Sequence, residues 1–458
     1  MNPVLKAALS EIVGPDNVSD RLMDRVADAY DGSTYSARPD GAVWVNDSSQ
    51  VSRVLALASR YRVPVTARGA GTGMCGLAVA VQGGIILDLG RMRKILEINI
   101  PDRLAVVQPG VVYGEFQYVL EKQRFFFPPD PASGQVCTLG GNVATNAGGL
   151  RGAKYGTTRD FVLGLEVILA SGEIMRTGAR TRKCASGYDL TRLFVGSEGT
   201  LGIVTEITLK VCPKPTHTAT CVAFFDAVQT AADAIAAIMH SDVTPSALEL
   251  LDGTVITMLR DHAALDLPQA AAMLLVETDG FSRQEVDDRL RRVSDRLQAS
   301  CAGKLETAAS DKDAERLWKA RKSIGGVVGK LPFSVIAEDI TVPISRIADF
   351  LQRCTDLSRR HGLALFNFGH AGDGNFHTDI LVDAADPAQH ARAERLLSEL
   401  HQLACELGGT LTGEHGIGIT KAAYMPFEHD PVALRTMRAL KHALDPQNIL
   451  NPGKMGLR

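Results

Sequence analysis

Short apolar runs separated by glycine or proline dominate the first 210 residues of the chain. Runs of this length that are rich in β-branched residues and end at turn-forming residues are typical of β-strands. These runs are VPVTARG (63–69), GGIILDLG (83–90), LAVVQPG (104–110), LGLEVILASG (163–172) and LGIVTEITLKV (201–211). Two segments between them, 50–60 and 113–122, place apolar residues at helical spacing instead. The pattern predicts a mixed α+β domain.

After residue 215 the pattern changes, and longer helical segments alternate with strands. Residues 226–240 (DAVQTAADAIAAIMH) have helical periodicity, and Asp226 is suited to the N-cap. Residues 284–298 carry interleaved charges at helical spacing. The strand-like segments are 272–277 and 335–342. We therefore predict a second α+β domain.

The longest predicted helix follows Asp386, a suitable N-cap, and runs to Leu407, where Gly408 and Gly409 end it. Its apolar face consists of Leu396, Leu397, Leu400, Leu403, Ala404 and Leu407. With 458 residues, the chain exceeds the size of a single hydrophobic core, so two or three domains are expected.

The charge and the termini narrow the class of protein. The chain has 49 basic and 52 acidic residues, a balance that gives no indication of a nucleic-acid partner. The N-terminal MNPVLKAALSEIVGPD has too short an apolar run for a secretory signal, and no stretch approaches the roughly 20 apolar residues of a membrane helix. We expect a cytoplasmic protein that is not transmembrane; peripheral contact with a membrane stays open.

The eight cysteines do not approach CxxC spacing. This argues against an iron–sulfur cluster or a structural zinc site built from the chain's own cysteines. We expect them to be small buried hydrophobes in a reducing compartment.

A glycine-rich stretch, RGAGTGMCG (68–76), formally contains GxGxxG. The dinucleotide fingerprint needs a helix at the last glycine and an acidic residue about 20 positions later, and neither condition is met. The backbone N–H groups of such a loop can still converge on an anion, to which Arg68 and Thr72 add a charge and a hydroxyl.

Two further segments strengthen the case for a ligand. TLGGNVATNAGG (138–149) follows PPDPAS (128–133), and GSEGTLG (196–202) comes later. Each loop alone is as well explained by a turn between strands. Together, their small residues favour a large, flat ligand lying against the backbone.

Histidines and a carboxylate are concentrated in GHAGDGNFH (369–377) and GEHGIG (413–418). Three glycines argue against a helix through His370 and His377, whereas a tight loop could turn both imidazoles toward one point. Two imidazole nitrogens and one carboxylate oxygen, from Glu414, suit zinc or a similar divalent ion. Solvated, hydrogen-bonded histidines are the alternative. An EF-hand is excluded because no glutamate stands at its twelfth position from Asp373.

Seven stretches extend this picture along nearly the whole chain. They are PVTARGAGTGMCG, PPDPASGQVCTLGGNVATNAGG, YGTTRDFVLGLEVILASGE, GSEGTLGIVTEITLKV, GHAGDGNFH, TGEHGIG and DPQNILNPGK. In this order, the chain resembles the flavin-dependent oxidoreductases of the vanillyl-alcohol oxidase and p-cresol methylhydroxylase type, and among them the D-2-hydroxyacid dehydrogenases. The resemblance implies an FAD-binding domain (1–215), a substrate or cap domain with a metal site (216–425), and a C-terminal segment (426–458) that packs back on the FAD domain.

The resemblance also assigns residues to the cofactor. The FAD pyrophosphate is assigned to Arg68, Gly69, Gly71, Thr72 and Gly73. The ribityl chain and ring are assigned to Pro131, Ser133, Gly140, Gly141, Asn142, Thr145 and Asn146. The adenine side is assigned to Glu198, Gly199 and Ile203, and the isoalloxazine to Asn451. Because the first loop lacks the histidine that some members attach to the flavin, non-covalent FAD is expected.

The implied chemistry is oxidation of a 2-hydroxyacid. The resemblance assigns His370, His377 and Glu414 to a divalent metal, zinc first with iron or manganese as alternatives. It makes His415 both a substrate contact and the base that removes the hydroxyl proton while hydride leaves C2 for flavin N5. A substrate chelated by its hydroxyl and carboxylate suits this arrangement.

The substrate is expected to be a small monocarboxylate. Arg321, in WKARK, resembles the family's carboxylate-binding arginine, although a solvated basic helix face is the alternative. Enzymes for 2-hydroxyglutarate carry lysine and asparagine where this chain has Ala337 and Asp379. We therefore expect D-lactate first and glycolate second.

Several functional alternatives stay open from the sequence. The chain could be the flavin subunit of a glycolate dehydrogenase with an iron–sulfur partner, a D-2-hydroxyglutarate dehydrogenase, or a non-catalytic flavin electron-transfer subunit. The electron acceptor could be an electron-transferring flavoprotein, a quinone, a cytochrome or an iron–sulfur subunit, since such surfaces leave no short motif. The oligomeric state is also open, with a homodimer among the alternatives.

Overall fold

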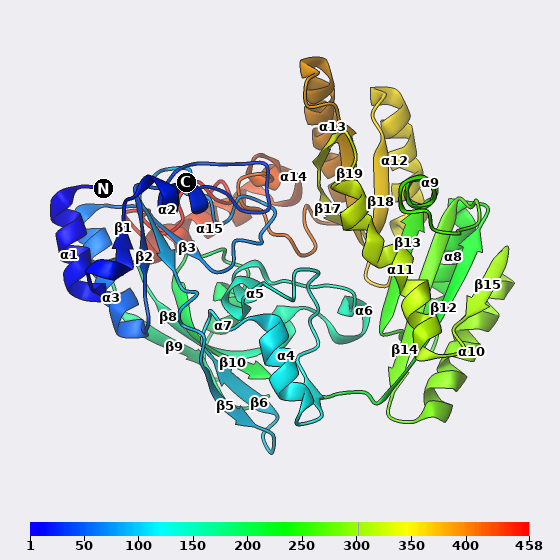
Figure 1. Cartoon of the computed structure of the whole chain (residues 1–458), viewed down its shortest axis with the longest axis horizontal. Helices are drawn as coiled ribbons and strands as arrows, with labels where there is room; N and C mark the ends of the chain where they lie inside the picture. The colour runs from blue at the N-terminus through cyan, green and yellow to red at the C-terminus, as the bar shows by residue number, and fades with distance from the viewer. Residues whose placement is uncertain (301, 458) are drawn as a thin grey trace. The chain divides into compact units, whose positions relative to one another are not determined.

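The computed structural model describes residues 1–300 and 302–457, which form two compact units (Figure 1). The first unit comprises residues 1–148, 157–214 and the C-terminal segment from Glu414 onward; the second comprises 149–156 and 215–413. This division falls after Gly413, whereas the expected boundary lay at residue 425. The reason is local, because the backbone N–H of Ile419 donates a 2.7 Å hydrogen bond to the carbonyl of Cys75 inside the first unit.

The first unit begins with a small four-stranded sheet. Strands β2 (Gly41–Trp44), β4 (Ile85–Asp88) and β3 (Val65–Arg68) are parallel, and β1 (Val18–Ser19) pairs antiparallel with β2. Buried apolar residues join this sheet to helices α1 (Pro3–Val13) and α3 (Ser48–Tyr61).

A five-stranded antiparallel sheet completes the β-structure around which this unit is built. Its order is β5 (Ile95–Asn99), β6 (Leu104–Val107), β10 (Ile203–Lys210), β8 (Val162–Ile168) and β9 (Ile174–Gly178). Burial alternates strictly along β10, as expected for a strand with one face in the core. The shorter elements of the unit are α2 (Leu22–Ala27), α4 (Tyr113–Glu121), β7 (Phe125–Phe126), α5 (Leu139–Thr145), α7 (Leu190–Phe194) and β11 (Cys212–Pro213).

The C-terminal segment is held in the first unit by buried lysines. It contains α14 (Met425–Glu428) and α15 (Pro431–Leu444). Lys441 donates to the carbonyls of Thr200 and Leu450, at 2.8 and 2.9 Å. Lys454 donates to the carbonyl of Val79 at 2.7 Å. Polar groups buried this deeply need such partners, so these bonds fix the path of the segment.

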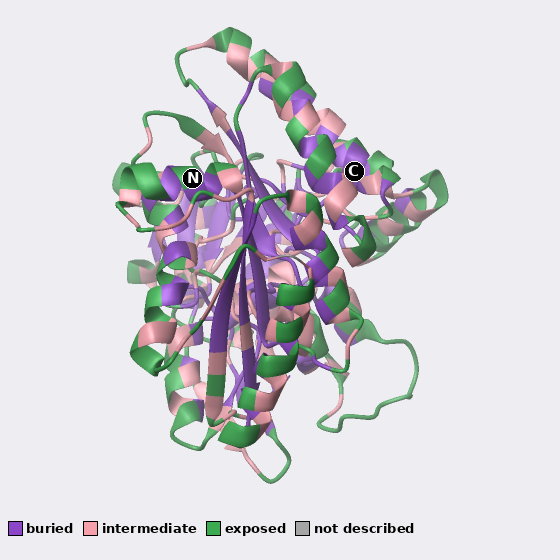
Figure 2. Ribbon diagram, turned by 90° about the vertical axis from the view of Figure 1, so that its right-hand side faces the viewer, coloured by how far each residue is buried: buried purple, intermediate pink, exposed green. Residues whose placement is uncertain are grey.

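An antiparallel sheet of eight strands forms the centre of the second unit. The strand order is β15 (Lys304–Thr307), β12 (His217–Phe225), β14 (Ala272–Gly280), β13 (Ala247–Asp252), β18 (Leu365–His370), β19 (Asn375–Val382) and β16 (Ser334–Ile336), with β17 (Asp339–Thr341) also paired to β19. Figure 2 shows buried residues concentrated on strands and exposed residues on the outer sides of helices.

Helices cover both faces of this sheet. One face packs against α8 (Val228–Met239), α10 (Arg283–Ala299), α12 (Ile347–His361) and α13 (Pro387–Glu406). The other face packs against α9 (Gly253–Ala263) and α11 (Asp311–Val328). The short helix α6 (Gly152–Tyr155) also belongs to this unit.

The predicted α+β class is confirmed, and most predicted elements are present. Asp386 caps α13 as predicted, accepting from the backbone N–H groups of Ala388 and Gln389. Asp226 does not cap α8, because that helix begins at Val228 with Ala227 at its N-cap. The predicted single strand 335–342 is divided into β16 and β17.

The predicted loop at 138–149 was wrong in part, because residues 139–145 form helix α5. Its N-cap is Thr138, whose hydroxyl accepts from the backbone N–H of Gly141. Capping here outweighs the low helix propensity of two glycines. The expectation that the cysteines are buried holds for Cys75, Cys137, Cys221 and Cys354, whereas Cys184 is exposed and Cys212 and Cys405 are half-buried. Cys301 lies outside the described residues.

Candidate active site

The first glycine-rich loop leaves β3 without entering a helix, as predicted. Gly71 has a φ of 66°, a left-handed conformation that favours glycine. A side chain at Gly69 would collide with the hydroxyl of Thr138, and one at Gly71 would collide with the guanidinium of Arg68. The two glycines therefore allow the loop to pack closely against α5 and against Arg68.

Arg68 supports this loop from inside the unit. Its Nε lies 3.3 Å from Oδ1 of Asp28, and its Nη1 donates to the carbonyl of Tyr30 at 2.9 Å. Burial raises the pKa of Asp28, although the charge of Arg68 opposes the shift. The guanidinium thus has protein partners already, and its assignment to a pyrophosphate stays a prediction.

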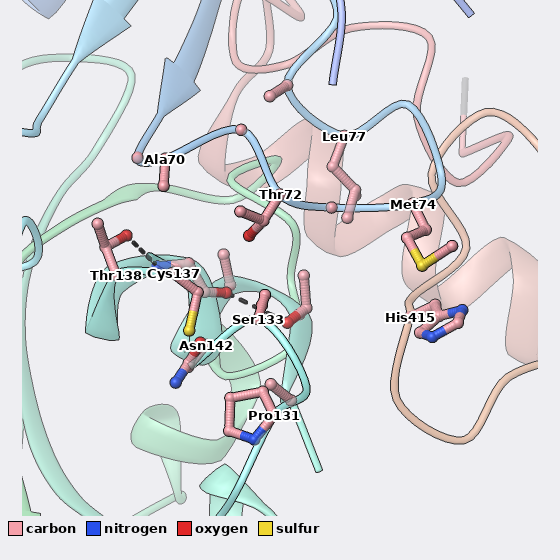
Figure 3. Close-up of a pocket in the computed structure, with 18 of the residues that line it drawn as sticks. Ala70, Thr72, Met74, Leu77, Pro131, Ser133, Cys137, Thr138, Asn142 and His415 are labelled. Atoms are coloured by element: carbon pink, nitrogen blue, oxygen red, sulfur yellow. Dashed lines mark hydrogen bonds between the residues drawn. The ribbon is translucent and has the colours of Figure 1, made fainter. Parts of the chain in front are cut away.

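A pocket in the first unit lies between this loop, α5 and the segment before it (Figure 3). Predicted cofactor residues that line it are Gly69, Gly71, Thr72, Gly73, Pro131, Ser133, Gly141, Asn142, Thr145, Glu198, Gly199 and Asn451. Arg68, Gly140 and Ile203 line an adjacent cavity. Asn146 lines neither and instead ends α5 with its Oδ1 accepting from the backbone N–H of Arg159. Sequence reasoning missed Met74, Leu77 and Cys137, which also line the pocket.

Two buried polar atoms at this pocket have no hydrogen-bond partner among the described residues. They are Nδ2 of Asn142 and Oδ1 of Asn451. The other amide atom of Asn451, Nδ2, donates to the carbonyls of Leu77 and Glu198, at 3.0 and 2.7 Å. Buried polar groups are rarely left unpaired, so these two atoms fit a polar ligand in the pocket. The residues present are therefore compatible with FAD.

Glu198 links the pocket to the segment that follows Gly413. Its carboxylate accepts hydrogen bonds from the backbone N–H groups of Ile417 and Gly418, at 2.6 and 2.9 Å. Burial raises the pKa of Glu198 to about 7, and these N–H groups together with Lys454 and Lys421 oppose the shift. The carboxylate thereby fixes the backbone close to His415, which also lines the pocket (Figure 3).

His370 and His377 lie on neighbouring strands of the second unit, β18 and β19, and the intervening glycines form the turn between them. Phe368 pairs with His377, so the two histidines point to the same face of the sheet. Their rings are 5.5 Å apart and perpendicular, and they offer ligand nitrogens within 4.8 Å of each other. The expectation that the loop brings both imidazoles together is met by a β-hairpin.

A buried carboxylate that sequence reasoning missed contacts His370. Oε1 of Glu249, on β13, lies 2.7 Å from Nδ1 of His370, and its Oε2 lies 2.6 Å from Nε of Arg321. Burial would raise the pKa of Glu249, but His370 and Arg321 outweigh it and lower the pKa to about 2. The only signal in the sequence was one charged residue inside the apolar run ALELL.

Arg321 does not stand on a solvated helix face. Its side chain is 15% exposed, and its guanidinium lies 5.1 Å from the ring centre of Phe368. No described residue accepts a hydrogen bond from its two terminal nitrogens. The geometry leaves them able to pair with a carboxylate.

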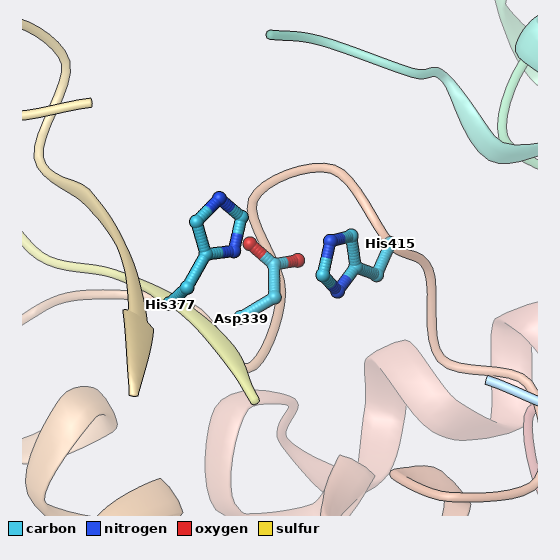
Figure 4. Close-up of side chains that lie close together, drawn as sticks. All are labelled: Asp339, His377 and His415. Carbon is cyan, nitrogen blue, oxygen red and sulfur yellow. The ribbon is translucent and has the colours of Figure 1, made fainter. Parts of the chain in front are cut away.

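Asp339 is a second carboxylate that sequence reasoning missed. It pairs with His377 in the register of β17 and β19, and the two side chains lie close together (Figure 4). Its Oδ2 accepts from the hydroxyl of Thr412 and the backbone N–H of Gly413, at 2.6 and 2.9 Å. Asp339 thus anchors the last residues of the second unit beside His377.

Asp379 follows His377 by two residues on β19 and points to the same face of the sheet. Burial, together with repulsion by Glu338, raises the pKa of Asp379 to about 7. The side chain therefore adds an acidic group, and no positive charge, to the face of the sheet that carries His377.

Glu414 and His415 begin the segment that belongs to the first unit. Gly413, which directly precedes them, is held by Asp339. Both Glu414 and His415 line the pocket of the first unit.

Comparison with known proteins identifies the class. The family model described as FAD linked oxidases, C-terminal domain, matches residues 214–455, and the model of an FAD binding domain matches residues 39–178. The chain belongs to the FAD-linked oxidases, and the family resemblance seen in the sequence is confirmed.

Relatives cover almost the whole chain. The Bacillus subtilis protein named glycolate oxidase subunit GlcD is 41% identical over 98% of this chain and 96% of its own length. The Arabidopsis thaliana protein named mitochondrial D-lactate dehydrogenase [cytochrome] is 35% identical over 91% of this chain and 73% of its own length. The structure of p-cresol methylhydroxylase with substrate bound has a TM-score of 0.81 at 20% identity, over 99% of this chain and 96% of that one, which supports the fold.

Among the described residues, no helix is both long and apolar enough to span a membrane.

Proposed function

We propose that this FAD-linked enzyme oxidises a small D-2-hydroxyacid to the 2-oxoacid, with D-lactate as the first candidate. The observation that carries the proposal is the pair of buried, mutually close imidazoles of His370 and His377, one of which is tied to Arg321 through Glu249. The names of the relatives, glycolate oxidase subunit and D-lactate dehydrogenase, point to the same substrate class.

A divalent metal is assigned to His370, His377 and Glu414, with zinc first and iron or manganese as alternatives. The buried histidine pair offers two nitrogen ligands within 4.8 Å of each other. Glu249 accepts from Nδ1 of His370, so the ring presents Nε2 as its metal-binding nitrogen. Glu414 follows Gly413, which Asp339 anchors beside His377. This donor set suits zinc.

Bound FAD supplies the acceptor for two electrons, and a bound divalent ion supplies positive charge that lowers the pKa of the substrate hydroxyl. The terminal nitrogens of Arg321 pair with the substrate carboxylate. His415 takes the hydroxyl proton as the C2–H bond breaks. Imidazole is the side chain most often used for proton transfer of this kind near neutral pH.

The size of the substrate follows from the charges around Arg321. The single guanidinium provides for one carboxylate, and Asp379 offers no positive charge to a second. Ala337 offers no positive charge where a five-carbon diacid would need one. These residues favour D-lactate or glycolate over 2-hydroxyglutarate.

Anaerobic mixing of the FAD-loaded enzyme with a panel of D- and L-2-hydroxyacids tests the proposal. Bleaching of the flavin absorbance near 450 nm by D-lactate, and more weakly by glycolate, is expected. Absence of bleaching by every acid in the panel would refute it and leave a non-catalytic electron-transfer subunit. The retention of His370, His377, Glu414 and His415 argues against that alternative.

A glycolate oxidase flavin subunit is the second candidate, because the 41% identical relative is named as a subunit. Such a chain would transfer electrons through an iron–sulfur partner, and it would lose dye reduction when expressed alone. Dye reduction by the isolated chain would instead support a self-sufficient dehydrogenase. In this second candidate function the electron acceptor is the iron–sulfur partner. A cytoplasmic location is also part of the proposal.

A further inference from the structure

We propose that Glu249 is a positioning residue that couples the metal-binding imidazole of His370 to the substrate-binding guanidinium of Arg321. This inference rests on the proposed function, in which His370 is a metal ligand and Arg321 binds the substrate carboxylate. The two oxygens of a single carboxylate serve the two partners, at 2.7 Å from Nδ1 of His370 and 2.6 Å from Nε of Arg321.

Burying the charge of Glu249 costs free energy unless the carboxylate is paired. Its side chain is fully buried, on the face of β13 that also carries Ala247 and Leu251. Moving an ionised carboxylate into an apolar interior is strongly unfavourable without charged partners and hydrogen bonds. Strand pairing supplies one partner directly, because Glu249 lies opposite His370 in the register of β13 and β18. The other partner, Arg321, belongs to helix α11, which packs against the face of the sheet that carries Glu249.

Glu249 fixes the tautomer of His370. The 2.7 Å contact of its Oε1 with Nδ1 makes this nitrogen the one that carries the hydrogen, and Nε2 then carries the lone pair. Imidazoles that bind metals depend on such an outer carboxylate for their orientation and basicity.

Glu249 also fixes the guanidinium of Arg321. It engages Nε, while the ring of Phe368 lies 5.1 Å from the guanidinium carbon. The same carboxylate therefore sets the separation between the metal-binding nitrogen and the carboxylate-binding arginine. In a 2-hydroxyacid the hydroxyl and the carboxylate are on adjacent carbons, so a fixed separation selects for this class of substrate.

Glu249→Gln tests the coupling with little change in shape. Whichever way the amide is placed, its N–H₂ group faces either the Nδ1–H of His370 or the Nε–H of Arg321, and two donors repel. Glu249→Ala removes both interactions. Glu277→Gln is the matched control, because Glu277 is a half-buried carboxylate on the adjacent strand β14 that accepts from the indole of Trp318 on the same helix α11.

The readouts are the affinity for Zn²⁺ and Mn²⁺, measured by titration of the metal-stripped, FAD-loaded enzyme, and KM for D-lactate with an artificial dye. Glu249→Ala is expected to lose about 10- to 100-fold in metal affinity and to raise KM. Glu249→Gln is expected to show at least one of these changes, and Glu277→Gln neither. All three variants should keep their flavin absorbance, which reports that the FAD unit is folded.

Three results would overturn the inference. If both Glu249 variants kept the metal affinity and the KM of the wild type, the coupling would be refuted and the proposed function would stand. If Glu277→Gln lost as much metal affinity as the Glu249 variants, the effect would come from general destabilisation of the sheet. A wild-type enzyme that binds neither metal would refute the metal assignment as well, whereas a wild type that binds metal without oxidising any hydroxyacid would refute only the proposed reaction.

Discussion

Oε1 of Glu198 accepts a 2.6 Å hydrogen bond from the backbone N–H of Ile417, two residues beyond His415. The second oxygen accepts from Gly418 in the same way. Both donors are buried, and so is the carboxylate. A single side chain from the FAD-binding part of the chain thus holds the backbone that carries the proposed base.

Removing this carboxylate should destabilise the first unit. Glu198→Ala leaves two buried N–H groups unpaired, at a cost of about 1–3 kcal/mol for each group. Glu198→Gln retains one acceptor oxygen and should therefore lose less stability than Glu198→Ala. Urea unfolding monitored by flavin fluorescence measures the difference, with exposed Glu115→Gln on α4 as the control. Equal stability of Glu198→Ala and wild type would show that the two hydrogen bonds contribute little.

Glu198 should also make stability depend on pH. Its pKa is raised from 4.5 to about 7 in the folded protein, so the folded state binds the proton more tightly than the unfolded state. The stabilisation is fully present below about pH 4.5 and is lost as pH rises through about 7. Between pH 5 and pH 8, the free energy of unfolding of wild type should fall relative to Glu198→Gln, by up to about 3 kcal/mol. Parallel pH profiles of the two proteins would contradict the raised pKa.

His370 is expected to be required for metal but not for flavin. His370→Ala removes an imidazole ligand and leaves Glu249 and Arg321 paired only with each other. Metal content measured by mass spectrometry should fall below about one tenth of wild type, because disruption of a metal site typically lowers metal affinity by about tenfold or more. FAD content should be unchanged. The control is His262→Ala on α9, an exposed histidine of the same unit. Full metal occupancy in His370→Ala would exclude this histidine as a ligand.

The sequence predicted the elements that depend on local pattern. Alternating apolar residues located β10, and helical spacing located α13 together with its Asp386 cap. The helix at 139–145 was missed because its stability comes from the Thr138 cap and from packing, which override two glycines. The motif glycines were assigned to ligand binding, but Gly69 and Gly71 also allow contact with Thr138 and Arg68.

The candidate site was predictable only as far as its motifs. His370 and His377 were recognised because they lie in one short segment, and β18 and β19 bring them together. Glu249 and Asp339 were missed because each contacts its histidine only through strand pairing. In a single sequence, an isolated acidic residue does not indicate which residue it will pair with. Arg321 was recognised by resemblance, but its ion pair with Glu249 depends on how α11 packs on the sheet.

His415 should be required for substrate oxidation but not for cofactor binding. His415→Ala leaves the hydrogen bonds of Glu198 to Ile417 and Gly418 in place, so the segment should keep its path. With no imidazole to take the hydroxyl proton, the rate of flavin bleaching by D-lactate should fall by about 100- to 10,000-fold, the usual contribution of a general base. Stopped-flow absorbance under anaerobic conditions measures that rate, and exposed His442→Ala in the same unit is the control. If the variant bleached at the wild-type rate, another group would have to take the proton. If its rate recovered steeply above pH 8, hydroxide would be replacing the imidazole, which supports the assignment of His415 as the base.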